Sequence, residues 1–135
     1  AYRGWGAELT GEISLVEAGM DRFFNLNKKS NFIGSEVLRE KLQSGVSIKI
    51  VYLEIDVDDA DARGNEPVYH NNKIVGVVTS GGYGFRINKS LAFAYVQAEL
   101  AKNETELFVE IQGQKRKAKI LNEPAYDPQN KKLKS

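Results

Sequence analysis

Four aspartates lie close together in the middle of the chain, at a spacing that could hold a divalent cation. They are Asp56, Asp58, Asp59 and Asp61. A calcium loop counted from Asp59 has Gly64 at the required sixth position, but Arg63 is fifth and His70 replaces the bidentate glutamate at the twelfth. The pattern therefore fails as a calcium site. Because crowded carboxylates without a cation repel one another, we expect a solvated loop between two strands.

The run Ser80–Gly84 is rich enough in glycine to suggest a phosphate-binding loop. However, Ile87 stands where a dinucleotide loop needs its third glycine, and no lysine follows in a phosphate-loop arrangement. Two interpretations remain open. The glycines permit a tight backbone at a strand end, or the loop contacts a ligand.

Histidine and cysteine chemistry is limited, because His70 is the only histidine and the chain has no cysteine. Thiolate nucleophiles, disulfides and histidine metal clusters are thereby excluded for this sequence. His70 flanks a predicted turn, where we expect an exposed structural role. A basic stretch, 115–119, shares its predicted face with Glu110 and Phe108, so we expect no nucleic-acid partner.

Trp5 is the only tryptophan, and it stands between Gly4 and Gly6 directly after Arg3. One interpretation is that its ring stacks on a planar ligand while the Arg3 guanidinium meets a carboxylate of that ligand. The other is that Trp5 fills the core beside two turn glycines. The residues by themselves leave both interpretations open.

The composition is that of one ordinary globular domain. The chain has 135 residues, of which 41% are hydrophobic and 27% charged, with a net charge of +1. No apolar stretch is long enough to cross a bilayer, and the first residues lack the apolar core of a signal peptide. We therefore expect a cytoplasmic protein that needs no membrane and no strongly charged partner.

Two helices are predicted in the first third of the chain. Ser14 and Glu17 have the spacing of a capping box, so a helix should begin near Leu15, with an apolar face formed by Val16, Met20, Phe23 and Phe24. For the second helix, Ser35 is the candidate cap and Gly45 the candidate stop. Its apolar stripe consists of Val37, Leu38 and Leu42.

Strand patterns follow. Residues 51–57 alternate apolar and polar, and Ile48 and Ile50 have the opposite parity, which predicts a bulge or burial on both faces. Asn71-Asn72 is a hairpin turn signal. A second turn at Gly113-Gln114 would pair Ile111 with Arg116 and Val109 with Ala118. The predicted fold is α+β, mainly β: a short helical segment followed by a small antiparallel β-barrel or sandwich.

Several short blocks resemble a known family. They are Arg3-Gly4-Trp5-Gly6, Leu15–Asp21, Phe32-Ile33-Gly34, Gly64–Pro67, Thr79-Ser80-Gly81 and Lys89–Val96. Together they span about residues 2 to 126 and resemble the carboxyl-terminal folate-binding region of the dimethylglycine and sarcosine dehydrogenases, itself similar to the aminomethyltransferase (T-protein) of the glycine cleavage system. The Trp5-Gly6 pair, the segment Gly64-Asn65-Glu66 and the block from Lys89 to Val96 favour the dehydrogenase branch.

The resemblance implies an organisation: 1–45 as the end of a folate-binding domain, 46–125 as the carboxyl-terminal antiparallel barrel and 126–135 as a flexible tail. It implies tetrahydrofolate as cofactor, bound with the help of Arg3, Trp5, Thr79, Ser80 and Gly81, and FAD in an N-terminal domain outside this chain. The implied partners are folate and those N-terminal domains, in the mitochondrial matrix if the source is eukaryotic. The family's catalytic aspartate and flavin-binding glycine loop have no counterpart here, so the resemblance implies a fragment that is not catalytic alone.

Three functions stay open at this point. The first is a fragment of a flavin- and folate-dependent N-methyl amine dehydrogenase that passes a one-carbon unit to tetrahydrofolate. The second is the corresponding domain of a glycine cleavage aminomethyltransferase. The third, of another class, is a barrel with a purely structural or docking role.

Overall fold

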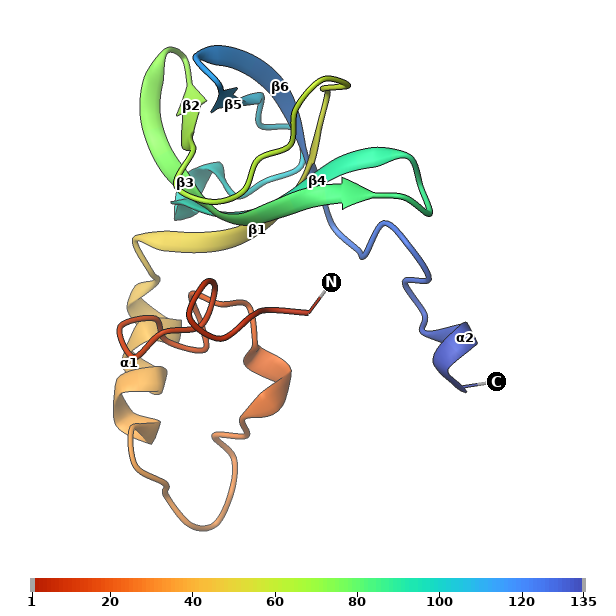
Figure 1. Ribbon diagram of the computed structural model, residues 1–135. Coiled ribbons are helices and arrows are strands. Elements are labelled where there is room, and N and C mark those ends of the chain that lie inside the picture. Colours follow the sequence, from red (N-terminus) through yellow and green to blue (C-terminus); the bar gives the residue numbers. More distant parts are fainter. Residues whose placement is uncertain (1, 135) are drawn as a thin grey trace.

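The computed structural model describes residues 2–134 and consists of a β-barrel with an irregular N-terminal segment against it (Figure 1). In chain order the elements are the 3-10 turn η1 (Asp21–Phe23), α1 (Ser35–Ser44), β1 (Ile48–Ile55), β2 (Pro67–His70), β3 (Lys73–Gly84), β4 (Lys89–Gln97), the 3-10 turn η2 (Ala98–Leu100), β5 (Leu107–Ile111), β6 (Gln114–Leu121) and α2 (Lys131–Lys134). The predicted class, a short helical segment followed by a small antiparallel barrel, is confirmed.

The strands close in the order β1-β4-β3-β2-β5-β6, and every neighbouring pair is antiparallel. Closure leaves no free sheet edge among these six strands. Alternate residues of each strand point inward because successive side chains lie on opposite faces. The main contributors to this core are Val51, Leu53, Ile55, Val68, Val78, Ala92, Ala94, Val96, Leu107, Val109, Ile111, Ala118 and Ile120.

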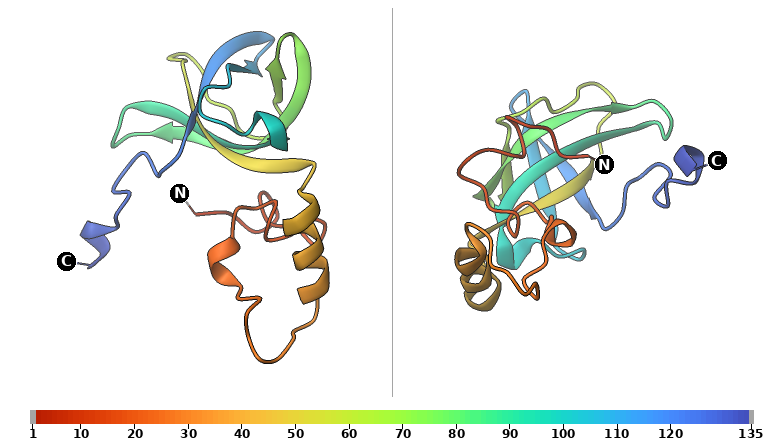
Figure 2. Two further views of the ribbon diagram at one scale, coloured as in Figure 1. Left: turned by 180° about the vertical axis from the view of Figure 1, so that it is seen from behind. Right: turned by 90° about the horizontal axis from the view of Figure 1, so that it is seen from below.

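Strand β1 is buried on both faces, as the two parities of its isoleucines and valines predicted. Val51 packs in the barrel core, whereas Ile50 packs on the outside of the barrel in a second cluster with Phe93 and Tyr95. The N-terminal segment covers this outer cluster, and Ile13 contacts it. In the left view of Figure 2 the segment lies beneath the barrel, with α1 beside it.

The helix predicted near Leu15 does not form. Ser14 and Glu17 do make the capping hydrogen bonds, since the Ser14 amide and hydroxyl donate to the Glu17 carboxylate at 2.7 and 2.6 Å. The chain then turns, because Gly19 has a φ of 60° and the Ile50 amide of β1 occupies the Glu17 carbonyl at 3.0 Å. That carbonyl is the acceptor that a continuing helix would need.

The second helix, α1, forms where it was predicted, with two differences. Gly34, not Ser35, occupies the cap position, and no side chain caps the helix. Gly45 ends the helix with a φ of 83°, but its ψ of 175° lies outside the left-handed helical region. Only Leu38 of the predicted apolar stripe is buried, while Val37 and Leu42 are exposed.

The hairpin at Asn71-Asn72 is confirmed. Both asparagines have positive φ, 49° and 61°, which is the requirement of a two-residue primed turn. The last hairpin was placed wrongly: its turn is Gln112-Gly113, and Ile111 pairs with Gln114 and Val109 with Arg116. The true register differs from the predicted one by two residues, so each side chain still faces the predicted side of the sheet.

The end of the chain leaves the barrel and carries the short helix α2 (Figure 1). The Asp127 carboxylate accepts hydrogen bonds from the backbone amides of Lys131 and Lys132 at 2.9 and 3.0 Å, which explains why a helical turn starts there. No helix in the described part of the chain is long and apolar enough to span a membrane. The division at residues 45 and 125 and the flexibility of the tail stay predictions.

Candidate functional site

Glu8 is the most constrained polar residue where the N-terminal segment meets the barrel. The residue is 2% exposed. One carboxylate oxygen, Oε1, accepts from the Thr79 and Ser80 hydroxyls at 2.7 and 2.6 Å, and Oε2 accepts from the Gly4 amide at 2.7 Å. The Tyr95 hydroxyl donates to the Glu8 main-chain carbonyl at 2.8 Å. Glu8 therefore joins the start of the chain to β3 and β4.

These bonds decide the ionisation of Glu8. Burial by itself would raise the pKa of Glu8, but the hydrogen bonds from Ser80, Thr79 and the Gly4 amide outweigh it and hold the pKa below its ordinary value. The carboxylate is thus the stable form. Its neighbour Tyr95 stays neutral, because burial, together with the negative charges of Glu17 and Glu8, raises the pKa of its phenol to about 12.

A second carboxylate, Glu17, ties α1 to the same segment. Besides the Ser14 bonds, it accepts from the Lys41 ammonium of α1 at 3.0 Å. Burial would raise the pKa of Glu17, but the Ser14 bonds and the Lys41 charge outweigh it and lower that pKa. Helix α1 is therefore attached to the barrel through the turn that Glu17 stabilises.

Trp5 projects from the Arg3–Leu9 turn, which hydrogen bonds from the amides of Glu8 and Leu9 to the Gly4 carbonyl hold in shape. Its side chain is 83% exposed. The interpretation of Trp5 as part of the core is therefore wrong for this structure. Its alternative role, stacking on a ligand, stays a prediction.

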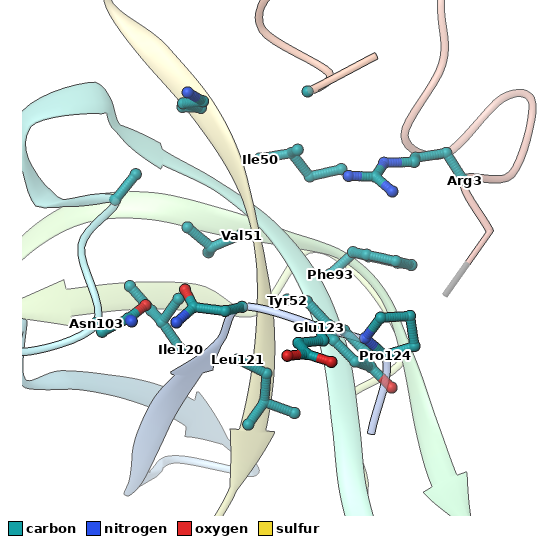
Figure 3. A pocket seen from close by; sticks show the side chains of 14 residues that line it. Arg3, Ile50, Val51, Tyr52, Phe93, Asn103, Ile120, Leu121, Glu123 and Pro124 are labelled. Atoms are coloured by element: carbon teal, nitrogen blue, oxygen red, sulfur yellow. The ribbon is translucent and has the colours of Figure 1, made fainter. Parts of the chain in front are cut away.

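Arg3 lies beside Trp5 in the chain but points elsewhere. Its Nε donates to the Ala18 carbonyl at 3.2 Å, and its guanidinium lies 5.5 Å from the centre of the Phe93 ring. Arg3 lines a cleft of about 380 Å³ between the N-terminal segment, β1 and the exit of β6. Figure 3 shows Arg3 reaching toward Ile50 and Phe93, with Glu123 and Pro124 elsewhere on the wall.

The glycine-rich run is explained in part by close backbone packing. A Cβ on Gly81 would lie 2.5 Å from the Ala62 carbonyl oxygen, so only glycine fits where the loop 56–66 crosses β3. That loop is less solvated than we expected, since Ala62 is fully buried in the core. Asp59 pairs with Arg116 at 2.7 Å at the same end of the barrel.

The remaining candidates contact other parts of the chain. Within residues 2–134 no three metal-binding side chains converge. His70 Nδ1 lies 2.8 Å from the Glu106 carbonyl, and its Nε2 lies 3.0 Å from the Asn71 side-chain amide, so the ring bridges the turn to β5. In the basic stretch, Lys117 pairs with Glu106 at 2.8 Å.

The structure therefore brings four of the five predicted site residues into two connected places. Thr79 and Ser80 bind Glu8, whose Oε2 holds the turn bearing Arg3 and Trp5. Gly81 faces the loop at Ala62 instead. None of this tests the prediction that they line a folate pocket.

Comparison with known proteins identifies the family of the barrel. A model of the glycine cleavage T-protein C-terminal barrel domain matches residues 49–127, more than half of the chain. The chain belongs to this family. The T-protein barrel accounts for the stretch from β1 through β6.

Relatives of this T-protein barrel extend the match to the N-terminal segment. Mitochondrial dimethylglycine dehydrogenases of Rattus norvegicus and Homo sapiens are each 40% identical over 124 residues, which is 92% of this chain and 14% of theirs. An aminomethyltransferase of Synechocystis is 35% identical over 127 residues, 94% of this chain and 34% of its own. The chain thus spans only a minor part of the relatives that it matches.

A solved structure supports the same fold. The crystal structure of glycine cleavage system aminomethyltransferase T from Bartonella henselae superposes with a TM-score of 0.82 at 27% identity, covering 91% of this chain and 35% of that one. The suspected relationship to the dimethylglycine dehydrogenase and aminomethyltransferase proteins is confirmed.

Sequence reasoning missed Glu8. The signature at Arg3–Gly6 stops two residues before it, and its partners Thr79 and Ser80 lie 71 and 72 positions further along the chain. Thr79 and Ser80 were themselves singled out, but as part of a loop near the folate cavity. No local pattern reveals that three hydroxyl and amide donors converge on one carboxylate.

Proposed function

We propose that this T-protein barrel is the carboxyl-terminal part of a flavin- and folate-dependent N-methyl amine dehydrogenase and contributes one wall of its folate pocket. The 40% identity to dimethylglycine dehydrogenases over 124 residues carries this choice, against 33% to 37% for aminomethyltransferases. In such an enzyme an N-methyl amine is oxidised, and the one-carbon unit passes to tetrahydrofolate. The chain is not catalytic alone.

The surface at Arg3–Gly6 has the right chemistry for a folate. A folate combines a planar pterin with a carboxylate-bearing tail, and the exposed Trp5 indole offers a face for stacking. The guanidinium of Arg3 packs on the Phe93 ring, and its Nε donates to the Ala18 carbonyl, so Arg3 holds this part of the chain in place. We therefore assign stacking to Trp5 and the supporting position to Arg3. FAD would occupy another domain, because the glycine run here lacks the dinucleotide pattern.

The proposed partner is the rest of the parent protein, docked on the N-terminal segment and α1. Several large apolar side chains of this segment are exposed. They are Phe23, Ile33, Val37 and Leu42. Exposed apolar side chains of this size favour a segment that another part of the protein covers. The cytoplasmic or mitochondrial location stays a prediction, although the dehydrogenase relatives are named as mitochondrial.

Two other functions compete with this one. An aminomethyltransferase would use the same barrel and folate without flavin, and a docking barrel would contact no ligand. The full-length protein distinguishes the enzymes: a dehydrogenase carries a flavin absorbance that an N-methyl amine bleaches, whereas an aminomethyltransferase carries none. A flavin-free full-length protein would overturn the dehydrogenase assignment.

Trp5→Ala in the full-length enzyme tests the pocket wall. Folate-dependent formation of methylenetetrahydrofolate should weaken, with the KM for tetrahydrofolate raised roughly tenfold by the loss of stacking, about 1.4 kcal/mol. Phe85→Ala is the matched control, because Phe85 is also 83% exposed but lies on the β3–β4 hairpin. Equal folate dependence in both variants would support the docking barrel instead. Trp5 fluorescence of this chain alone should be quenched only weakly by tetrahydrofolate.

A further inference from the structure

We propose that Thr79 and Ser80 are positioning residues, which act on the folate pocket through Glu8 by holding the Arg3–Leu9 turn that presents Trp5. This inference rests on the proposed function and changes the role of two residues in it. The resemblance placed Thr79 and Ser80 in a folate-binding loop near the cavity. The hydrogen bonds of the structure direct them to a protein carboxylate instead.

The strand irregularity in β3 explains how two neighbouring hydroxyls reach one carboxylate. Successive residues of a regular strand point to opposite faces. Here Val78 pairs with Ala94 and Ser80 with the next residue, Phe93, so Thr79 is an extra residue in β3. Such a bulge redirects side chains. Both hydroxyls consequently meet Oε1 of Glu8 on the outside of the barrel.

The hydroxyl protons are committed by these bonds. A serine or threonine hydroxyl has one proton to donate, and the two shortest contacts, 2.6 and 2.7 Å, are to the Glu8 carboxylate. The other acceptor near Thr79, the Phe93 carbonyl, is more distant at 3.3 Å. Neither residue can therefore donate to folate without releasing Glu8.

The second carboxylate oxygen of Glu8, Oε2, fixes Gly4, which lies between Arg3 and Trp5 in the chain. Oε2 accepts from the Gly4 amide, and the Glu8 amide returns a hydrogen bond to the Gly4 carbonyl at 3.1 Å. A Cβ on Gly4 would lie 3.3 Å from Oε2, so the carboxylate packs directly on this backbone. Tyr95 holds the Glu8 main chain from β4. The orientation of Trp5 relative to the barrel is thus set by β3 and β4.

Trp5 provides the spectroscopic test in this chain, because it is the only tryptophan. In Glu8→Gln a side-chain NH2 group replaces one carboxylate oxygen. It must face either the Gly4 amide or the Thr79 and Ser80 hydroxyls, so the hydrogen bonds on that side of residue 8 are lost. Time-resolved fluorescence anisotropy should show the fast local motion of Trp5 rising roughly twofold in amplitude. Thr79→Val should act in the same direction, whereas Thr79→Ser, which keeps the hydroxyl, should restore the wild-type decay. Circular dichroism checks that each variant keeps its barrel.

Glu66→Gln is the matched control. Glu66 also holds backbone amides, those of Arg63 and Gly64 at 2.8 and 2.7 Å, but it lies in the loop before β2. It should leave the motion of Trp5 unchanged. Unchanged Trp5 motion in folded Glu8→Gln and Thr79→Val would overturn the positioning role, and if Glu8→Gln does not fold, the comparison of Thr79→Val with Thr79→Ser decides.

Kinetics of the full-length enzyme separate this inference from the function on which it rests. Thr79→Val should raise the KM for tetrahydrofolate roughly three- to tenfold while kcat for amine oxidation stays unchanged, and Thr79→Ser should rescue it. If Thr79→Val increases the local motion of Trp5 but neither Thr79→Val nor Trp5→Ala changes the KM for tetrahydrofolate, the proposal that this chain forms a wall of the folate pocket is wrong. If Trp5→Ala raises the KM and Thr79→Val raises it without loosening Trp5, Thr79 is a direct ligand and the positioning role is wrong.

Discussion

The Thr79 hydroxyl donates to the Glu8 carboxylate at 2.7 Å, joining residues that are 71 positions apart in the chain. This contact fastens the first turn of the chain to the bulged strand β3. Because the carboxylate is buried and accepts three hydrogen bonds, protonation turns one of its acceptor oxygens into a donor, and a neighbouring donor loses its acceptor. The ionisation of Glu8 therefore contributes to the interface between the N-terminal segment and the barrel.

We expect the free energy of unfolding to fall as the solution is acidified below about pH 4.5. The pKa values of Glu8 and Glu17 are lowered in the folded protein from an ordinary 4.5. The stability that they contribute is complete above the unfolded value and is lost as the pH falls through the folded values, because the unfolded chain binds more protons there. Urea unfolding between pH 7 and pH 3 measures this.

Glu8→Gln isolates the contribution of Glu8 to the acid profile. It should be less stable than the wild type at pH 7 by about 1–3 kcal/mol, because a buried donor loses its acceptor, and the gap should narrow toward pH 3. Glu12→Gln, an exposed change in the same segment, should follow the wild-type profile. A gap for Glu8→Gln that is constant with pH would contradict the role given to its charge.

Gly76→Ala should destabilise the barrel strongly. A Cβ at this position of β3 would lie 2.2 Å from the Tyr95 carbonyl oxygen and 2.9 Å from the Val96 Cα, both backbone atoms of the adjacent strand. The clash must separate β3 from β4, at a cost of about 1–3 kcal/mol or more. Gly82→Ala is the control in the same strand, since nothing lies within 4 Å of its Cβ. Thermal melts in which both variants behave alike would contradict this packing.

Gln112→Asn should stabilise the last hairpin. Gln112 has a φ of 51° and precedes Gly113 with a φ of 77°, the pair of positive angles found in a primed turn. Asparagine adopts the left-handed region more easily than glutamine, so the free energy of unfolding should rise by up to about 1 kcal/mol. Gln114→Asn, one step into β6, should not stabilise the protein. If the turn were instead at Gly113-Gln114, Gln114→Asn would stabilise the protein and Gln112→Asn would not.

Local sequence patterns predicted much of the architecture, because turns and strand faces depend on residues that are close together in the chain. Asn71-Asn72 forms the expected turn, and the mixed parity around Ile50 reflects real burial on both sides of β1. The turn of the last hairpin was misplaced by one residue, which shifts the cross-strand pairing by two. The error arose because glycine suits either central position of a two-residue turn and strand alternation is the same in both registers. The outward and inward faces were nevertheless predicted correctly.

The sequence by itself determined the family signatures, the absence of a thiol or histidine metal site, and a helical segment before a small barrel. Only the tertiary structure decided what happens after Ser14, where the Ile50 amide takes the Glu17 carbonyl and ends the expected helix. It alone also decided that Trp5 is exposed and that Thr79 and Ser80 bind Glu8. These contacts join residues far apart in the chain, and local spacing carries no information about which distant donor reaches which acceptor.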